Sequence, residues 1–339
     1  MSLVESLLAG DRLALSRVLS QVENHTAQGQ AALSALFPYA GRAQLVGVTG
    51  APGTGKSSLV NQLARYYRRP PQAEQPRRVA VVAVDPSSPF TGGAILGDRI
   101  RMRDLAGDPG VFIRSMASRG SLGGLASTTT SLVQVLDAAG FEIILIETVG
   151  VGQAEVDVAR LAHTVLVVEA PGMGDDVQAI KAGILEIADV LVVNKADQPG
   201  AANTERILRG MLELAHPSRR ALRHHGRLEN APFPEVASPD LPLWMPPIQR
   251  TVATDGTGVP ELVQAITRHQ AYLQQSGGWQ QREHYRLQVE MESLLRQRLY
   301  ERLQEKLPHE LYHQVLKDLV ERRVSPQQAV DKLIEGGNL

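Results

Sequence analysis

The stretch Gly50-Ala51-Pro52-Gly53-Thr54-Gly55-Lys56-Ser57 fits the pattern G-x-x-x-x-G-K-[ST], in which a glycine-rich loop wraps a phosphate group. It follows an apolar run at 45–48 that predicts a buried strand. The glycines let backbone N–H groups point inward, Lys56 neutralises β- and γ-phosphate charge, and the Ser57 hydroxyl can ligate Mg²⁺. Ser58, also assigned to the GTP-binding residues, continues as a helix whose positive dipole end faces the anion. The sequence therefore predicts a nucleoside triphosphate site.

A second motif indicates which base is bound. The apolar run at 190–193 predicts another buried strand, and Asn194-Lys195-Ala196-Asp197 stands at its carboxyl end, where α/β folds place ligand contacts. The Asp197 carboxylate can accept hydrogen bonds from both N1–H and the exocyclic amine of guanine, a donor pair that adenine lacks. We expect Asn194 to orient the base through N7 and the Lys195 stem to cover its face. The motif favours GTP.

Composition excludes several classes of protein. The chain has 339 residues, 43% of them hydrophobic, which is enough for one sizeable α/β core with accessory helices. Its formal net charge of −1 provides no basic field for nucleic acid or anionic membrane. The absence of cysteine excludes disulfides and thiolate metal sites. No secretory signal or long uncharged apolar span is evident, so we expect a soluble, cytoplasmic protein.

Apolar runs separated by helix-length segments set the fold class. Strand candidates lie at 45–48, 79–84, 111–114, 143–146, 164–168, 190–193 and 248–252. Such alternation predicts an α/β P-loop GTPase fold with a mostly parallel sheet covered by helices on both faces. Ala253, directly after the last candidate, is assigned to the GTP-binding residues. The proline-rich segment 216–247 is expected to be a long connection.

Helical extensions are expected at both ends of the chain. Spaced leucines and valines before residue 40 predict a helical cap at 1–40, followed by a GTPase domain at 41–275. Beyond it, a helix at 287–307 carries one narrow apolar stripe, so it needs a partner surface. That surface is either the chain's own domain or a second subunit; the length of the stripe favours the second. We therefore expect the segment 276–339 to be an arm that forms a homodimer.

Acidic residues between the two motifs are candidates for the reaction centre. The apolar run at 143–146 ends in Glu147-Thr148-Val149-Gly150, where a γ-phosphate sensor is expected, so Glu147 and Gly150 join Lys56 as catalytic candidates. Asp85 ends the run at 79–84, and Asp98 follows in a glycine-containing segment. Ser57, Asp85, Asp98 and Glu147 are candidate Mg²⁺ ligands, and Asp98 is also a catalytic candidate. Solvated loop acids are the alternative reading of the two aspartates.

Several strings in this order resemble one known family. They are Asp85-Pro86-Ser87-Ser88, Thr91-Gly92-Gly93, Ile95-Leu96-Gly97-Asp98-Arg99, Ser121-Leu122-Gly123-Gly124 and Glu147-Thr148-Val149-Gly150-Val151-Gly152-Gln153. Together they look like the methylmalonyl-CoA mutase-associated GTPase family, of the SIMIBI class of P-loop GTPases, over nearly the whole chain. The resemblance implies a GTPase that chaperones an adenosylcobalamin-dependent mutase, gating cofactor loading or repair. By the same resemblance, Asp175, Gln178 and Lys181 belong to a loop that couples the nucleotide to the mutase; an ordinary strand-to-helix connection is the alternative.

Two other functions stay open. Members of the same family have been labelled arginine/ornithine transport kinases, so transfer of the γ-phosphoryl group to a small molecule or a protein is one alternative. A metal-insertion GTPase is the other, although such proteins usually carry Cys/His-rich motifs and this chain has no cysteine. Val151 stands where regulatory GTPases often place a water-orienting glutamine, so unaided hydrolysis should be slow.

Overall fold

The structure, a computed structural model, describes residues 2–70, 75–86, 102, 104, 105, 107–118, 124–148, 154–172, 186–221 and 243–337. The chain divides into two compact units, Met1–Arg286 and Leu287–Leu339. The first unit contains the sheet and its covering helices.

A parallel sheet forms the centre of the first unit. Within the described residues its strands are β1 (Gln44–Thr49), β2 (Val79–Pro86), β3 (Val111–Ser118), β4 (Ile143–Thr148), β5 (Thr164–Glu169), β6 (Val190–Val193) and β7 (Ile248–Arg250). Their order is β3-β2-β4-β1-β5-β6-β7, and each neighbouring pair is parallel. After β1 the chain adds β2, β3 and β4 on one side and β5, β6 and β7 on the other, so the strand ends around β1 lie at the switch point where such sheets bind ligands. The predicted fold class is confirmed.

The strand predictions hold, although several strands differ in length from the expected ranges; β3, for example, continues to Ser118 instead of ending at residue 114. All seven candidates are strands, and β1, β4, β5 and β6 are buried throughout, as near-continuous Val/Ile/Leu runs predict. The last strand, β7, has only three residues. After it, Val252 pairs with Thr257 in an isolated antiparallel bridge, so the chain turns back on itself instead of extending the strand.

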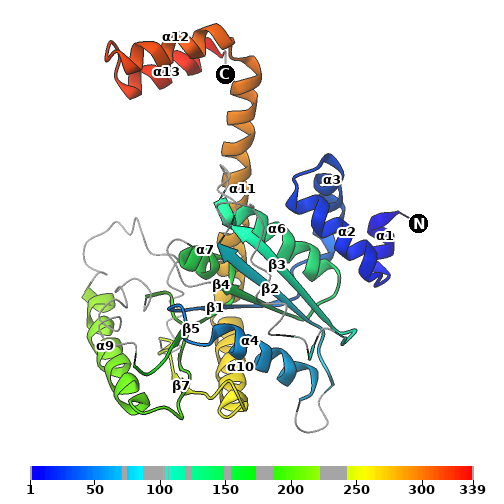
Figure 1. Cartoon of the computed structure of the whole chain (residues 1–339), viewed down its shortest axis with the longest axis vertical. Helices are drawn as coiled ribbons and strands as arrows, with labels where there is room; N and C mark the ends of the chain where they lie inside the picture. Colours follow the sequence, from blue (N-terminus) through cyan, green and yellow to red (C-terminus); the bar gives the residue numbers. More distant parts are fainter. Residues whose placement is uncertain are drawn as a thin grey trace. The chain divides into compact units, whose positions relative to one another are not determined.

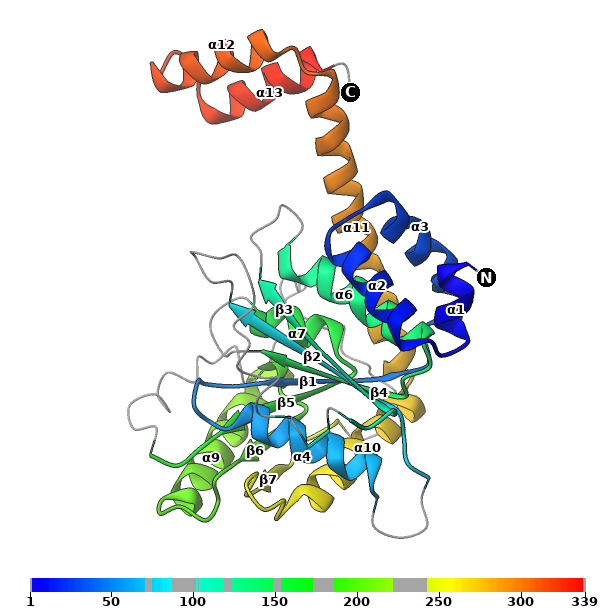
Figure 2. The ribbon, with the colours of Figure 1, turned by 45° about the vertical axis from the view of Figure 1, so that its right-hand side comes forward.

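Helices cover both faces of this sheet. The described helices are α1 (Leu3–Leu8), α2 (Arg12–Glu23), α3 (Ala27–Leu36), the short 3₁₀ turn η1 (Phe37–Tyr39), α4 (Lys56–Arg68), α6 (Gly124–Ala138), α7 (Ala154–Leu161), α9 (Ala201–Ala221), α10 (Val259–Ser276), α11 (Gly278–Lys306), α12 (His309–Val320) and α13 (Pro326–Gly336). Apolar residues of α4 and α10 pack on one face, and those of α6, α7 and α9 pack on the other (Figures 1 and 2). None of the described helices combines the length and apolar character needed to cross a membrane.

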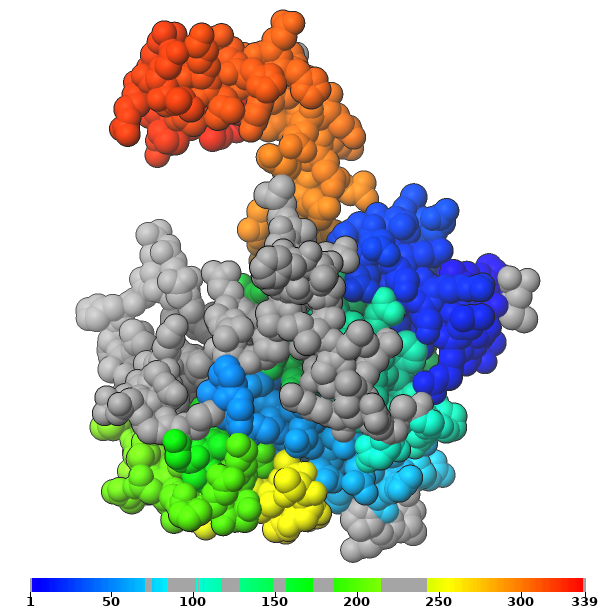
Figure 3. Space-filling view, in the orientation of Figure 1, coloured from blue at the N-terminus to red at the C-terminus, as the bar shows by residue number. Residues whose placement is uncertain are grey.

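The N-terminal helices α1–α3 pack against α6. Leu15, Val18 and Leu19 of α2 are buried in the same cluster as residues of α6 and of strands β2 and β4. Asp11 begins α2 by accepting hydrogen bonds from two backbone N–H groups of its first turn, as an N-cap aspartate does. In the space-filling view these helices form a dark blue lobe beside the blue-green surface of the same unit (Figure 3).

One expected connection is partly helical. The prediction that a connection begins at residue 216 is wrong, because α9 continues to Ala221. Pro217 removes one backbone N–H from the helix, which usually costs about 3 kcal/mol, but tertiary context often overrides such propensities. Residues 222–242 of the connection lie outside the described part of the chain.

The second unit contains the later part of α11 together with α12 and α13. Val315 of α12 and Ala329 of α13 are buried between these helices. Ser325 and Gln328 form a capping box at the start of α13. Apolar side chains stay exposed on this unit, among them Met291 at 61%, Leu295 at 55% and Val320 at 74%.

Candidate functional site

The phosphate loop lies between the carboxyl end of β1 and the start of α4. Two of its glycines are required by their positive φ and by close neighbours, a backbone carbonyl at Gly50 and a side chain at Gly55. Gly50 has a φ of +137°, and a Cβ there would lie 2.1 Å from the Val168 carbonyl oxygen of β5. Gly55 has a φ of +91°, and its Cβ would lie 2.4 Å from Nδ2 of Asn194. Gly55 has no side chain with which to cap α4, so the first N–H groups of the helix can serve an anion.

Lys56 and Ser57 are buried at the start of α4 and point toward the predicted reaction centre. The Lys56 ammonium donates hydrogen bonds to the carbonyl oxygens of Gly50 and Ala51, at 2.8 and 2.9 Å, so it lies against the loop that it is expected to serve. The Ser57 hydroxyl donates to Oε1 of Glu147 at 2.5 Å. Two of the predicted Mg²⁺ ligands, far apart in sequence, therefore meet in one buried place.

The strand register explains how Glu147 reaches this place. In the sheet, Glu147 of β4 lies opposite Val48 of β1, two residues before the phosphate loop. The next residue, Thr148, donates a hydrogen bond from its hydroxyl to that of Thr49 at 3.1 Å, which joins the two strand ends. Asp85 lies near the carboxyl end of β2, at the same edge. Asp98, Gly150, Asp175, Gln178 and Lys181 lie outside the described residues.

Asn194 joins three loops at the base side of the site. Its Nδ2 donates to the Thr54 carbonyl oxygen of the phosphate loop at 2.8 Å. Its Oδ1 accepts from the Thr251 hydroxyl and from the Ala253 N–H, both at 3.1 Å. Asn194 is buried, with 1% of its surface exposed. The structure thus gives Asn194 a second role, as the connection between the phosphate loop and the base loops.

The other predicted base contacts lie around Asn194. Lys195 has a φ of +54°, an uncommon conformation for a lysine, and is half-buried. Asp197 is exposed. The backbone N–H of Ala253 is engaged by Asn194, and the residue is buried. The predicted phosphate and base residues therefore lie at one edge of the sheet.

Comparison with known proteins identifies the family. The sequence profile described as Methylmalonyl Co-A mutase-associated GTPase MeaB matches residues 13–307 of the chain. The chain belongs to this family. It is thus a member of a GTPase family, which agrees with the resemblance seen in the sequence.

Individual members show how far the similarity extends. A protein of Pyrococcus horikoshii is 44% identical over 293 residues, which cover 86% of this chain and 84% of that protein. The GTPase ArgK of Escherichia coli is 37% identical over 299 residues, covering 87% of this chain and 82% of the relative. Among solved structures, the LAO/AO transport system kinase superposes with a TM-score of 0.64 and 28% identity, covering 98% of this chain and 95% of that one.

A buried ionic network lies at the opposite, amino-terminal edge of the sheet, and the sequence patterns did not reveal it. Arg282 of α11 donates hydrogen bonds to both carboxylate oxygens of Asp189 at 2.8 Å, and to the His163 carbonyl oxygen at 2.6 Å. Asp189 and His163 immediately precede β6 and β5. The start of α11 is thereby held against two of the strands that lead to the nucleotide loops.

Two buried histidines complete this network. The Leu45 N–H donates to Nδ1 of His163, so the neutral ring carries its proton on Nε2 and donates it to Glu283 at 2.7 Å. His269 lies 3.2 Å from Asp189 through Nε2, and its Nδ1 meets the Thr164 hydroxyl at 3.0 Å. His163 is thus placed as a neutral donor to Glu283, and His269 lies beside the Asp189 carboxylate.

The burial of this network shifts its protonation equilibria. Burial lowers the pKa of His269 to about 4, and the Asp189 carboxylate offsets this only in part. Burial likewise lowers the pKa of His163, although Glu283 opposes it. Burial acts to raise the pKa of Glu283, but hydrogen bonds from His163 and Arg286 outweigh it and bring that pKa to about 2. Both imidazoles are therefore neutral, and Glu283 is ionised, at neutral pH.

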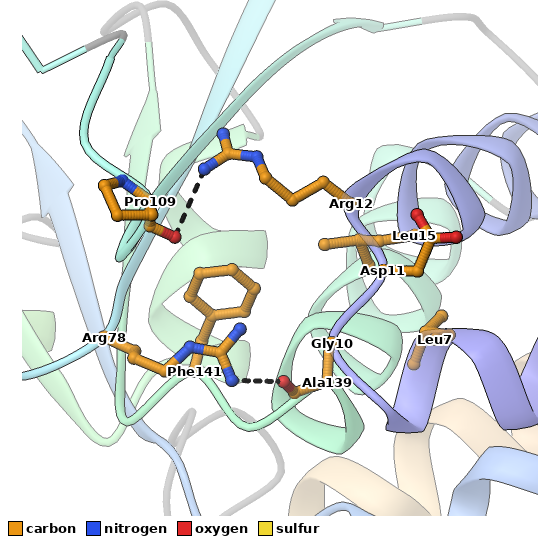
Figure 4. Close-up of a pocket in the computed structure, with 9 residues that line it drawn as sticks. All are labelled: Leu7, Gly10, Asp11, Arg12, Leu15, Arg78, Pro109, Ala139 and Phe141. Carbon is orange, nitrogen blue, oxygen red and sulfur yellow. Dashed lines mark hydrogen bonds between the residues drawn. The ribbon is translucent and has the colours of Figure 1, made fainter.

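A small pocket also lies away from the phosphate loop (Figure 4). It is formed where the N-terminal helices meet the amino-terminal ends of the strands, and it is lined by Leu7, Gly10, Asp11, Arg12, Leu15, Arg78, Pro109, Ala139 and Phe141. The guanidinium of Arg12 donates to the Pro109 carbonyl oxygen at 3.2 Å, and that of Arg78 donates to the Ala139 carbonyl oxygen at 2.9 Å. The Arg12 contact attaches the N-terminal helices to the amino-terminal end of the sheet, opposite the phosphate loop, and the Arg78 contact joins the start of β2 to the residue that follows α6.

Proposed function

We propose that this chain is a GTP-binding and GTP-hydrolysing chaperone that gates the loading or repair of adenosylcobalamin in methylmalonyl-CoA mutase or a related acyl-CoA mutase. The observation that carries the proposal is the match to the mutase-associated GTPase family over residues 13–307. The site supports the nucleotide half of the proposal through the phosphate loop and the contact between Ser57 and Glu147. The family supports the mutase half.

Each residue of the proposed reaction centre has an expected role. The loop at 50–57 and the start of α4 would hold the phosphates, and Lys56 would neutralise their charge. The Ser57 hydroxyl and the Glu147 carboxylate would hold Mg²⁺, with Asp85 and Asp98 as further candidates, because hard oxygen donors are the ligands that this ion prefers. When bound, Mg²⁺ supplies charge neutralisation at the transferred phosphoryl group.

Guanine specificity is proposed to depend on Asp197. The carboxylate is exposed at the end of the β6 loop, next to the Asn194 connection. Losing a charge-assisted bidentate contact costs on the order of 2 to 4 kcal/mol, so Asp197→Ala should weaken GTP binding by roughly a few tens to several hundred fold. Calorimetry with GTP and ATP measures this. Equal affinities of the wild-type chain for the two nucleotides would contradict guanine specificity.

The mutase role calls for a complex that senses the nucleotide. A purified adenosylcobalamin-dependent acyl-CoA mutase should bind this chain, with an affinity that differs between GDP and a non-hydrolysable GTP analogue. Such coupling is reciprocal and typically about 1 to 3 kcal/mol, or roughly 5- to 150-fold in affinity. Calorimetric titration in each nucleotide state provides the measurement. No binding in either state would refute the chaperone proposal.

A kinase is the second candidate, because the solved structure with a TM-score of 0.64 is described as a LAO/AO transport system kinase. A kinase would transfer the γ-phosphoryl group to an amino acid or a protein, whereas a GTPase releases it as inorganic phosphate. Following γ-labelled GTP with arginine, ornithine or protein acceptors separates the two. We expect the label in inorganic phosphate alone; label in an acceptor would favour the kinase.

A further inference from the structure

The loop after β7 is closed on itself, so its position depends on a few outside contacts. The Val252 N–H donates to the Thr257 carbonyl oxygen at 2.9 Å, and the Gly256 N–H donates to the Val252 carbonyl oxygen at 2.9 Å. Gly256 has a φ of +89° and supplies the turn. The segment is a compact body whose shape is fixed by internal hydrogen bonds, and the residue before it, Thr251, is joined through its backbone to Val193 and Ala196.

Two side chains hold this loop at a single residue, Ala253. The Ala253 N–H donates to Oδ1 of Asn194 at 3.1 Å. Its carbonyl oxygen accepts from Nε2 of Gln62 at 3.1 Å. Asn194 belongs to the base motif, and Gln62 belongs to α4, the helix that begins with the phosphate-binding Lys56. The base loop is therefore fastened on one side to the base motif and on the other to the phosphate helix.

The local packing makes Gln62 suited to this task. Its neighbours in α4, among them Leu59 and Leu63, are fully buried in the core, so the helix is a rigid support. The Gln62 side chain is half-buried and lies along the base loop, since a Cβ added at Gly256 would lie 3.4 Å from its Oε1. A neutral amide is the fitting group here, because its N–H₂ can donate to the carbonyl oxygen without leaving a buried charge.

We propose that Gln62 is a positioning residue for guanine specificity: it sets the distance between the loop at Ala253 and the phosphate helix, and so the width of the base site. The inference rests on the proposed guanine site at Asp197 and Ala253. Recognition of the guanine edge needs hydrogen bonds of correct length and direction, so a displaced loop loses guanine preference before it loses phosphate affinity. Gln62 itself needs no contact with the nucleotide.

The test uses two variants of nearly the same size. In Gln62→Glu a carboxylate faces the Ala253 carbonyl oxygen, and in Gln62→Met the donor is removed without adding charge. Affinities for GDP and ADP are measured by calorimetry on the full chain, together with the kcat and KM of GTP hydrolysis. Losing a hydrogen bond of this kind corresponds to roughly a five- to tenfold change. We expect the GDP-to-ADP preference to fall about tenfold in both variants, while ADP affinity stays nearly unchanged. In GTP hydrolysis, the rise in KM should be larger than the fall in kcat.

Arg65→Ala provides the matched control on the same helix. Arg65 is 46% exposed and forms a 3.5 Å ion pair with Asp104, away from the base loop. The GDP-to-ADP preference of Arg65→Ala should therefore equal that of the wild type. If the wild type prefers GDP and both Gln62 variants keep that preference, the inference is refuted while the guanine site stands. Equal losses of GDP and ADP affinity would likewise refute it, because they indicate general destabilisation. A wild type without preference would refute the guanine site and this inference together.

Discussion

At the scale of single residues, the reaction centre depends on side chains whose partners lie far away in sequence. Ser57 and Glu147 are 90 residues apart and share a 2.5 Å hydrogen bond. Gly50 and Gly55 leave room for Val168 of β5 and for Asn194, which directly follows β6. The sequence motif specifies which residue types stand at these positions, and the contacts give the physical reason for those residue types.

Replacing Glu147 should separate binding from turnover. A ligand of the metal matters most when charge develops on the transferred group, so Glu147→Ala should slow GTP hydrolysis by roughly a hundredfold while GDP affinity changes only a few fold. Phosphate release and calorimetry measure the two quantities. Glu142→Ala is the control, since Glu142 stands before the amino end of the same strand and is exposed. Turnover in Glu147→Ala equal to that of the control would remove Glu147 from the reaction centre.

At the scale of elements, the amino-terminal edge of the sheet is held by charge rather than by apolar packing alone. The Arg282–Asp189 pair and the two neutral histidines attach α11 and α10 to the starts of β5 and β6. Both tryptophans of the chain belong to this region: Trp279 stacks on His163 at 3.7 Å, and Trp244 lies 4.8 Å from His269, measured between ring centroids. Tryptophan fluorescence therefore reports on this network.

Stability should fall as the pH drops below neutrality. The folded-state pKa of His269, about 4, is below its ordinary value of 6.5, so the unfolded chain binds a proton that the folded chain does not. The contribution of His269 is fully present above pH 6.5 and is lost as the pH falls toward 4. Each such histidine adds a slope of up to about 1.4 kcal/mol per pH unit to the free energy of unfolding.

The measurement is urea unfolding followed by tryptophan fluorescence between pH 7.5 and 5. His269→Gln removes one of the two titrating groups, so the slope should decrease by up to about 1.4 kcal/mol per pH unit, while His163 maintains the remainder. An unchanged slope in His269→Gln would show that this ring is not held neutral in the folded chain.

The sequence revealed the nucleotide edge of the sheet far better than the opposite edge. The phosphate motif and the base motif are each an unbroken string of residues. The Val/Ile run before each motif places it at the end of a strand. No local sequence pattern marks His163, Asp189 and Arg282, because these residues come into contact only after β5, β6 and α11 have come together. The expected break at 216 was wrong for a related reason: the effect of a proline depends on the helix around it, and α9 continues to Ala221.

At the scale of the whole molecule, the chain offers an exposed apolar surface on its second unit. Exposed side chains there include Met291, Leu294, Leu295, Leu299, Tyr300, Tyr312, Leu316, Val320, Val330 and Ile334. Exposed apolar side chains in such number often mark interaction sites, which favours the expected homodimer. The first turns of α11 belong to the other unit, where Arg282 and Glu283 complete the ionic network.

Truncation therefore tests the homodimer if it leaves the network intact. A chain ending after Glu290 keeps Arg282 and Glu283, and it should sediment as a monomer that binds GDP like the full chain. Removing Arg282 as well would leave Asp189 as a buried, unpaired charge and cost about 3 to 5 kcal/mol, so a cut after Gly278 should fold poorly. A full-length chain that sediments as a monomer at micromolar concentration would contradict the dimer.

The central claim, a GTPase that serves a cobalamin-dependent mutase, is tested most directly by titrating purified adenosylcobalamin-dependent methylmalonyl-CoA mutase into this chain and following phosphate release from GTP. We predict a rate that rises and saturates with mutase, stays at background in Lys56→Ala, and responds less in Asp175→Ala, Gln178→Ala and Lys181→Ala, whose basal GTP affinity should stay near wild type. A wild-type rate that does not respond to the mutase at any concentration would contradict the claim.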